Sequence, residues 1–292
     1  GCRFGPGSSV GVRGNTHIHK AGMSPLTFRS AYGLALYKES TLLSSIAKIG
    51  EEHRQKVYGC ERVRHSNLRF VPKDSLVSRV IVVEPSVDMF IQKGIGKIIE
   101  GALRQRFGID IRYQPDINRL LAKKGSIDGT WSTIDLSSAS DTISLQLLKA
   151  VCKYAPMLHE LILEFRAPSV VCNGEVIDLH MVSTMGNGFT FPLQTYLFAS
   201  VVEYVSKKSR ANVFGDDIVC RTKHFDQLVD ELTSLGFVVN RKKSFKEGNF
   251  RESCGGDYHS GRDVRGVYCK KLETARDFYV LWNRLQKWCE RE

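Results

Sequence analysis

The sequence predicts an α+β fold in which an antiparallel sheet is flanked by helices. Short β-forming runs flank turn sequences at Asn173-Gly174 and Gly215-Asp216-Asp217, a pattern typical of hairpins. Residues 87–107 instead carry apolar side chains at helical spacing, with lysines and arginines on the opposite face. The chain has 292 residues, of which 42% are hydrophobic and 25% charged, as in soluble globular proteins. This length accommodates one large or two ordinary domains.

The net charge points to a polyanionic partner. The chain carries 42 Lys and Arg against 31 Asp and Glu, a formal charge of +11. Such an excess favours nucleic acid first and an acidic membrane surface second. A generically basic soluble protein is an equally good interpretation of the charge alone.

Other whole-chain features narrow the class of protein. Eight cysteines include no Cys-x-x-Cys pair, which argues against a zinc finger or a disulfide framework and favours reduced thiols in a cytosolic protein. The longest apolar stretch, residues 189–205, is interrupted by Pro192, Gln194 and Glu203, so we expect a buried helix and no membrane span. The chain begins without Met or a signal sequence, from which we expect an internal fragment of a longer protein.

The first 107 residues are predicted to pass from a loop into helices and strands. Residues 1–27 are rich in Gly, Ser and Pro and are expected to form a loop or extended arm, and residues 28–59 have an irregular helical pattern of core type. A β-rich run over 62–85 follows, and Ser86 is expected to cap a helix over 87–107. Cations recur along that run, where they could line a channel for phosphates or protect a solvated edge strand: Arg62, Arg64, Arg69, Lys73 and Arg79.

The middle of the chain offers the first isolated carboxylates. Residues 108–129 are interpreted as a mixed connection, residues 131–136 as a strand and residues 142–154 as a helix. Asp135 lies near the end of the strand, where its desolvation requires a partner, whereas Asp141 is by default a helix cap. Glycines 186 and 188 precede a helix to about Val205, and they either admit a close ligand or only form the loop-to-helix turn.

The segment Phe214-Gly-Asp-Asp217 places two adjacent carboxylates at the tip of a hairpin. Side-by-side carboxylates repel unless a cation neutralises them, and oxygen ligands favour Mg²⁺ or Mn²⁺. A solvated surface turn is the alternative. If the predicted strand 131–136, which carries Asp135, were the neighbour of this hairpin in one antiparallel sheet, three carboxylates could hold two divalent cations about 4 Å apart, as in polymerases and nucleases.

The last quarter is predicted to contain a helix over 224–235, a strand over 237–240, a basic cluster over 241–246 and an amphipathic helix over 273–292. The apolar face of that final helix is expected to stay partly bare. Its members are Phe278, Leu281, Trp282, Leu285 and Trp288.

Three segments resemble motifs A, B and C of the RNA-dependent RNA polymerases of positive-strand RNA bacteriophages, specifically the levivirus replicase β-subunit. They are Ile134-Asp-Leu-Ser-Ser-Ala-Ser-Asp-Thr-Ile-Ser144, Met185-Gly-Asn-Gly-Phe-Thr-Phe191 and Phe214-Gly-Asp-Asp217. Residues 242–255 and 258–264 resemble the D and E region of that family, residues 79–85 with 89–96 its fingers motif F, and residues 4–7 an earlier fingers segment. The resemblance follows the order of the family along almost the whole chain.

The resemblance implies a right-hand polymerase with an antiparallel palm sheet flanked by helices, a largely helical fingers region and a truncated thumb. Fingers would occupy 1–129, the palm 130–270 with a fingers-like insertion near 155–182, and the start of the thumb 271–292. It also implies two Mg²⁺ ions, for which Mn²⁺ could substitute, an RNA template and product, ribonucleoside triphosphates, and the bacterial host cytoplasm. Bacterial translation factors and a ribosomal protein are further implied partners, and no membrane is.

Individual roles carry over by position in the motifs. Asp135, Asp216 and Asp217 match the metal-binding aspartates, and Lys242 or Lys243 the motif D lysine proposed to protonate pyrophosphate. The residues that resemble those gripping the nucleotide or sensing its ribose are Lys73, Arg79, Ser183, Gly186 and Asn187. Many viral polymerases have a second motif A aspartate five residues after the first, which helps to sense the ribose 2′-hydroxyl. Here position 140 is Ser and the nearest aspartate is Asp141.

The predicted function is RNA-directed RNA synthesis, in which a 3′-hydroxyl attacks the α-phosphate and pyrophosphate leaves. A reverse transcriptase is the nearest alternative enzyme, and Gly215 together with the Gly-Asn-Gly loop favours the RNA polymerase. A catalytically inactive RNA-binding fragment is the alternative from another class.

Overall fold

A computed structural model describes residues 2–5, 7–14, 16–73, 77–207, 210–269 and 271–290. It contains both helices and sheets, which confirms the predicted α+β class. The chain divides into two compact units. The first comprises residues 1–71, 80–108 and 138–197, and the second comprises residues 72–79, 109–137 and 198–292. Pro6 of the segment 4–7, residues 74–76 of the basic run and residues 291–292 of the tail lie outside the described residues.

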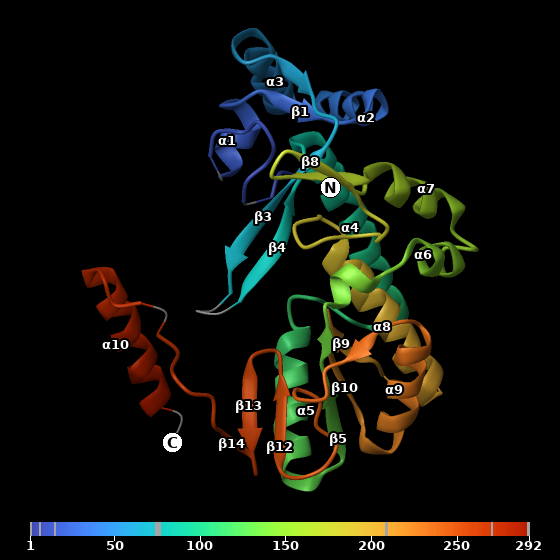
Figure 1. The fold of residues 1–292 in the computed structure, drawn as a ribbon, viewed down its shortest axis with the longest axis vertical. Helices are drawn as coiled ribbons and strands as arrows, with labels where there is room; N and C mark the ends of the chain where they lie inside the picture. The colour runs from blue at the N-terminus through green and yellow to red at the C-terminus, as the bar shows by residue number, and fades with distance from the viewer. Residues whose placement is uncertain are drawn as a thin grey trace. The chain divides into compact units, whose positions relative to one another are not determined.

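The first unit combines helices with a mixed sheet (Figure 1). Its early elements are α1 (His17–Gly22), β1 (Leu26–Phe28), α2 (Ala31–Leu42), α3 (Ser45–Val57), β2 (Cys60–Arg62), most of β3 (Ser66–Pro72), most of β4 (Ser78–Val83) and α4 (Ser86–Phe107). Pro72, Ser78 and Arg79 belong to the second unit. Its later elements are η1 (Ala139–Thr142), α6 (Leu145–Val151), α7 (Pro156–Phe165), β7 (Ser169–Cys172), β8 (Glu175–Asp178) and the first half of α8 (Thr190–Ser206).

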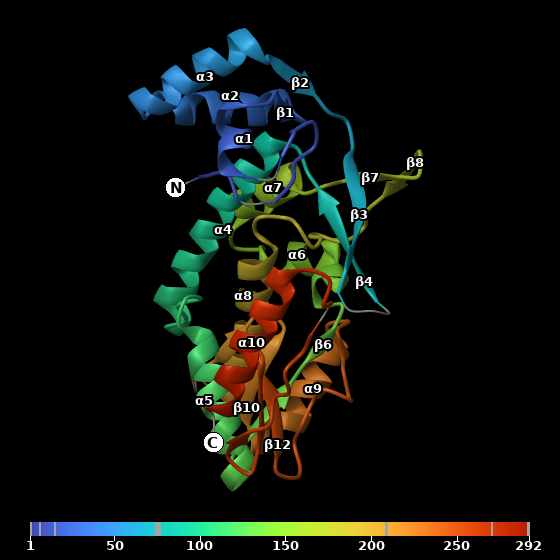
Figure 2. The same cartoon turned by 90° about the vertical axis from the view of Figure 1, so that its left-hand side faces the viewer.

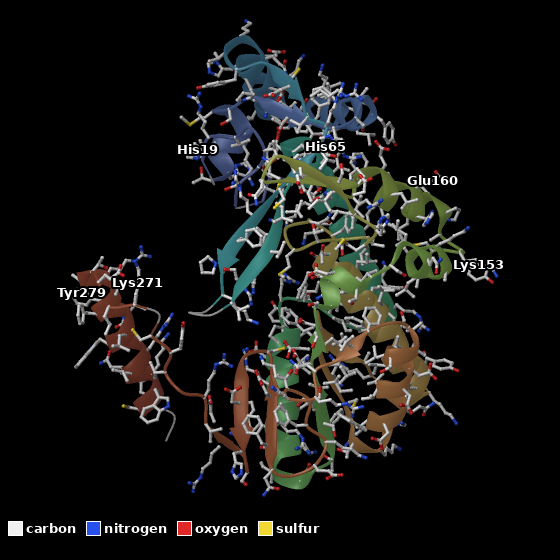
Figure 3. The ribbon with its side chains drawn as sticks, viewed as in Figure 1. His19, His65, Lys153, Glu160, Lys271 and Tyr279 are labelled. Atoms are coloured by element: carbon white, nitrogen blue, oxygen red, sulfur yellow. The ribbon has the colours of Figure 1, made fainter. Side chains whose placement is uncertain are left out.

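The sheet of the first unit has the order β4-β3-β7-β8, and β3 and β4 lie side by side as an extended ribbon (Figures 1 and 2). Strand β3 runs parallel to β7, and β7 antiparallel to β8. His65 joins the beginning of β3 to β7, with its Nδ1 2.7 Å from Ser169 Oγ (Figure 3). The β7–β8 turn has positive φ at Asn173 (51°) and Gly174 (87°), as a type I′ turn requires, so the predicted hairpin is confirmed.

Three predictions for the first unit are wrong. The helical segment 28–59 is not of core type, because Leu42, Leu43, Ile46 and Ile49 are exposed on α2, α3 and their connection. Residues 1–27 are not only a loop, since they contain α1 and the beginning of β1. The third error is the cap of α4, where Ser86 makes no capping bond.

The side chain of Ser86 is used in tertiary contacts with β1 instead. Its Oγ accepts from the Thr27 N–H at 3.1 Å, while its own N–H donates to Thr27 Oγ1 at 3.0 Å. These buried bonds satisfy the polar groups at the start of α4 and fasten β1 to that helix.

The second unit is built on a three-stranded antiparallel sheet of order β5-β10-β9. Its elements are α5 (Gln114–Asp128), β5 (Trp131–Ile134), β6 (Leu136–Ser137), the second half of α8, β9 (Asn212–Phe214), β10 (Asp217–Arg221), η2 (Thr222–His224), α9 (Phe225–Ser234), β11 (Val238–Val239), β12 (Phe250–Ser253), β13 (Gly256–His259), β14 (Arg262–Asp263) and α10 (Ala275–Cys289). Strand β6 pairs with β11, and β12-β13-β14 form a second antiparallel sheet.

Helix α5 packs against strands of both three-stranded sheets (Figure 1). Its presence corrects the prediction that residues 108–129 are only a connection. The helix approaches β5 so closely that a Cβ on Gly125 would lie 2.3 Å from the Trp131 carbonyl oxygen. Helical periodicity does not predict α5 because two polar residues on its buried face, Gln114 and Asn118, interrupt the apolar pattern.

The core of the second unit lies between the three-stranded sheet and helices α8 and α9. Phe198 of α8 meets Phe237 edge to face at 4.8 Å, and Ile134, Ile218 and Leu232 are almost completely buried. The predicted helices 224–235 and 273–292 correspond to α9 and α10. Trp282 on α10 is 63% exposed, in agreement with the predicted bare face, and Tyr279 projects from the same helix (Figure 3).

None of the helices in the described ranges combines the length and the apolar character needed to cross a membrane.

Candidate active site at the β9–β10 hairpin

The hairpin formed by β9 and β10 carries the two adjacent aspartates at its turn. Phe214 pairs with Asp217, which leaves Gly215 and Asp216 as the two loop residues. Gly215 has φ of +62°, whereas Asp216 is not among the residues with positive φ, a combination that fits a type II′ turn. Glycine is the residue that tolerates this first position, so the sequence Gly-Asp-Asp and the turn agree.

Strand β5 lies beside β10, as the predicted mechanism requires. Ile218 pairs with Ile134 and Val219 with Thr133 in an antiparallel ladder. Continuing that register by one residue places Asp135 opposite Asp217. Both isoleucines are buried, so the carboxylates emerge where the apolar ladder ends. The predicted neighbourhood of Asp135 and the hairpin is confirmed.

Asp135 is oriented by the segment that follows β11. Asn240 Nδ2 donates to Asp135 Oδ2 at 2.8 Å, and the Asn240 N–H donates to the Asp135 carbonyl at 2.9 Å. Ser244 Oγ accepts from the Asp135 N–H at 3.1 Å. Burial raises the pKa of Asp135, and the negative charge of Asp216 raises it further, against the bond from Asn240.

Asp217 is oriented by the turn between β12 and β13. The Cys254 N–H donates to Asp217 Oδ1 at 2.9 Å, and Ser253 Oγ lies 3.3 Å from the same atom. Cys254 and Gly255 both have positive φ (49° and 75°), as the two loop residues of a type I′ turn require, and this turn presents the Cys254 amide to the carboxylate. Burial raises the pKa of Asp217, and the charges of Asp216 and Asp135 raise it further, in opposition to the Cys254 bond.

Two further supports were not predicted from the sequence. Asn118 Nδ2 donates to the Asp217 carbonyl at 3.3 Å, and its own Oδ1 accepts from Gln114 Nε2 at 2.9 Å. Arg251 is fully buried and donates to Trp131 O at 2.7 Å as well as to the loop before β12. No motif or spacing marks Arg251 in the sequence, since it resembles any other basic residue of that region.

The lysines near Asp135 differ in their contacts. Lys243 Nζ lies 3.8 Å from Glu252 Oε1, and its charge lowers the pKa of Asp135. The charge of Lys73, which belongs to the same unit as Asp135, also lowers the pKa of that carboxyl group. Lys242 is exposed, as is Arg79 on β4.

The other three predicted site residues lie in the first unit. Ser183 is buried, with its Oγ 3.5 Å from the Ser140 carbonyl. Asn187 is also buried, and Gly186 has φ of +116°. The default interpretation of Asp141 as a helix cap is wrong, because Ser144 caps α6 by accepting from the Leu147 N–H at 3.1 Å.

The chemistry of the donors at the hairpin fits a hard divalent cation, since all three are carboxylates, and burial together with the charge of Asp216 raises the pKa of both Asp135 and Asp217. In the described part of the chain no three Asp, Glu, His or Cys side chains are already gathered as a metal site. Asp135 and Asp217 instead point one oxygen each at Asn240 and Cys254. A cation would therefore compete with or share these hydrogen bonds.

The fold resembles that of viral RNA-dependent RNA polymerases. The RNA-dependent RNA polymerase of a human picorbirnavirus matches with a TM-score of 0.50 at 12% identity, over 67% of this chain and 43% of that one. An insertion-loop deletion mutant of a human picorbirnavirus polymerase matches with the same TM-score at 14% identity, over 78% of this chain and 54% of that one.

Sequence relatives identify the family. Residues 1–292 match the family described as RNA replicase, beta-chain. The chain is 34% identical over 295 residues to the RNA-directed RNA polymerase beta chain of Enterobacteria phage GA, covering 98% of this chain and 54% of that protein. It is 38% identical over 225 residues to the RNA-directed RNA polymerase subunit beta of Escherichia virus Qbeta, covering 75% and 38%. The chain belongs to the RNA replicase β-chain family, and it spans about half or less of the length of these relatives.

Proposed function

We propose that the protein containing this chain copies RNA from ribonucleoside triphosphates on an RNA template. One observation carries the proposal: the β5–β10 register sets Asp135 opposite Asp217, with Asp216 in the adjoining turn. This arrangement supplies three carboxylates at the end of one antiparallel sheet, which is what two-metal phosphoryl transfer needs. Membership in the replicase family supports the choice of RNA synthesis over other reactions of this kind.

Asp135, Asp216 and Asp217 are the residues that would hold two Mg²⁺ ions, with Mn²⁺ as a substitute. When bound, the ions would activate the 3′-hydroxyl and stabilise the charge on the leaving pyrophosphate. The chain's own contribution is orientation, since Asn240 and Cys254 each fix one carboxylate oxygen. Such fixed groups lower the reorganisation needed when the reaction begins.

Lys243 is the better candidate for the proton donor to pyrophosphate. Its charge acts on Asp135 and it pairs with Glu252 at 3.8 Å. This distance leaves the ammonium weakly held and able to turn towards a substrate.

The triphosphate would be gripped by Lys73 and Arg79, and the ribose would meet Ser183, Gly186 and Asn187. Arg79 is exposed and therefore free of a buried structural role. The bond from Ser183 to the Ser140 carbonyl favours a ribose site that includes the 140–141 turn.

We assign residues 1–129 to the fingers, 130–270 to the palm with an insertion near 155–182, and 271–292 to the start of the thumb. The protein would act in the bacterial host cytoplasm. Host translation factors and a ribosomal protein are the partners expected from the resemblance.

The test is primer extension by the full-length protein on an RNA template. Asp217→Asn should lower incorporation of ribonucleotides about 10³-fold or more, because losing a metal ligand costs several kcal/mol at about 1.36 kcal/mol per tenfold. Asp230→Asn on the exposed side of α9 is the matched control and should leave the rate unchanged. Retained activity in Asp217→Asn would refute the assignment of metal ligands. A clear preference of the wild type for deoxynucleotides would instead favour a reverse transcriptase.

A further inference from the structure

A buried glutamate in the first unit is linked by hydrogen bonds to the loop over residues 184–189, which contains Gly186 and Gly188 and is called the Gly186–Gly188 loop below. Glu84 lies between β4 and α4 and is 1% exposed. Gln92 Nε2 donates to Glu84 Oε2 at 2.6 Å and to the Phe165 carbonyl at 2.7 Å. The Gly188 N–H donates to Gln92 Oε1 at 3.0 Å. Both N–H groups and the carbonyl oxygen of the Gln92 amide are therefore used, which fixes its orientation.

Asn187 approaches the same carboxyl group from the loop. It forms a side-chain interaction that stabilises the charged form of Glu84, and its Oδ1 accepts from the Phe189 N–H at 3.0 Å. Glu84 Oε1 is buried and accepts no hydrogen bond of normal geometry from the described residues. The carboxyl group thus faces the loop with one oxygen only weakly satisfied, an arrangement that costs stability and calls for an explanation.

The loop backbone is pressed against β4 and α4. The Val82 N–H donates to the Met185 carbonyl at 2.9 Å. A Cβ on Gly186 would lie 2.4 Å from Val82 O, and one on Gly188 would lie 2.9 Å from Gln92 Cβ. Across the same contact, a Cβ on Gly96 of α4 would lie 2.8 Å from Gly188 O. These close approaches leave no room for a side chain at the three glycines, so the loop backbone packs directly against β4 and α4.

The electrostatic surroundings keep Glu84 neutral near pH 7. Burial raises the pKa of Glu84 to about 8. The carboxylate of Asp88 on α4 raises it further, whereas Gln92, Arg29 and Asn187 lower it. Arg29 is itself held by Asp88 at 3.2 Å, so its charge only partly compensates.

We propose that Glu84 and Gln92 are positioning residues that hold the Gly186–Gly188 loop in the single conformation that discriminates ribonucleotides from deoxyribonucleotides. The inference rests on the proposed function, because the loop is the segment expected to meet the ribose. Neither residue need touch the substrate, since both act through the backbone of Gly188 and the side chain of Asn187. Loosening the loop should therefore cost selectivity more than it costs RNA binding.

The test uses full-length replicase and four variants. Glu84→Gln keeps a neutral hydrogen-bonding group, Glu84→Ala removes it, and Gln92→Met removes three bonds at similar volume. Glu160→Gln on α7 is the control, an exposed glutamate whose side chain is labelled in Figure 3. We measure kcat and KM for ribo- and deoxyribonucleotides at pH 7 and pH 9, together with RNA binding.

Glu84→Ala and Gln92→Met should lower the preference for ribonucleotides about tenfold, mainly through KM, and leave RNA binding unchanged. The wild type should lose preference between pH 7 and pH 9 as Glu84 ionises, while Glu84→Gln should keep it at both. An equal loss of kcat for both nucleotide types, with preference constant in every variant and at both pH values, would overturn the proposal.

Amide hydrogen exchange gives a readout that is independent of activity. At one fixed pH, the amides of Gly188 and Phe189 should exchange about tenfold faster in Gln92→Met than in the wild type or Glu160→Gln. Unchanged protection of these amides would also overturn the proposal. Inactivity of the wild type on all nucleotides would refute the proposed function, whereas the exchange result would still decide whether Glu84 and Gln92 hold the loop.

Discussion

Replacement of Arg251 by methionine should destabilise the second unit. The Arg251 guanidinium is fully buried and makes five hydrogen bonds to main-chain carbonyls at 2.7–3.2 Å. The acceptors belong to Trp131, Lys246, Glu247, Gly248 and Phe250. The side chain thereby closes the 246–250 loop around itself and attaches the loop to β5.

The magnitude follows from what the carbonyls lose. A hydrogen bond from a charged donor contributes about 1.5–3 kcal/mol net, and five such bonds share one guanidinium, so they do not add. Methionine recovers about 1–2 kcal/mol by burying its apolar side chain, and water can reach part of the opened loop. We therefore expect Arg251→Met to lower the free energy of unfolding by about 3–5 kcal/mol, a large share of the 5–15 kcal/mol typical of a domain.

Urea unfolding at constant pH, followed by circular dichroism and tryptophan fluorescence, measures the change. Arg276→Met on exposed α10 is the matched control and should shift the free energy by less than about 0.5 kcal/mol. A loss below about 1 kcal/mol for Arg251→Met would refute the reasoning, because it would mean that the loop carbonyls find water without cost. The loss of unfolding free energy for Arg251→Lys should fall between those of Arg251→Met and Arg276→Met, since an ammonium offers three donors but lacks the planar, forked geometry of a guanidinium.

Two further predictions concern the first unit. The pKa of Glu84 rises from 4.5 to about 8 on folding, so the folded chain binds a proton that the unfolded chain releases, and stability should fall as pH rises through that window and level off above it. Glu84→Gln should remove this dependence of the unfolding free energy on pH, which amounts to a few kcal/mol at about 1.36 kcal/mol per pKa unit. Identical pH profiles of the wild type and the variant in urea unfolding would contradict the argument that burial raises the pKa of Glu84. Gly186→Ala should lower the free energy of unfolding by about 2 kcal/mol or more and therefore lower Tm, because φ is +116° and the new Cβ would lie 2.4 Å from Val82 O. Calorimetry that found an unchanged Tm would rule out the close contact.

Local signals in the sequence predicted the hairpins well. Asn173-Gly174 and Gly215-Asp216 contain residues that accept positive φ, which indicates a tight turn, and the structure has a hairpin at each of the two positions. Helical periodicity predicted α4 equally well but could not say which faces are covered. Ile98 of α4 is 62% exposed and Leu43 at the end of α2 is 89% exposed, because a period identifies a face and not its neighbour.

The carboxylates of the candidate site could be predicted, but their supports could not. Asp135 and the two hairpin aspartates stand out because unpaired carboxylates beside apolar strands need a cation or donors. Asn240 lies 105 residues from Asp135, and Cys254 lies 37 from Asp217. The tertiary fold decides which backbone or side-chain donor lies beside each carboxylate oxygen. Neither an asparagine nor a cysteine in the sequence indicates that it will be such a donor.

The place of β10 between β5 and β9 has a consequence for the order of folding. Strand β5 is synthesised well before β10. While the intervening first-unit segment emerges, the edge of β5 that later pairs with β10 has no partner strand. From Asp135 to Cys254 are 119 residues (254 − 135), which takes roughly ten seconds at about 5–20 residues per second. Closing so long a loop is slow and entropically costly. The three aspartates should therefore be among the last groups of the second unit to reach their places, and the nascent chain should depend on β5 remaining protected until Cys254 has appeared.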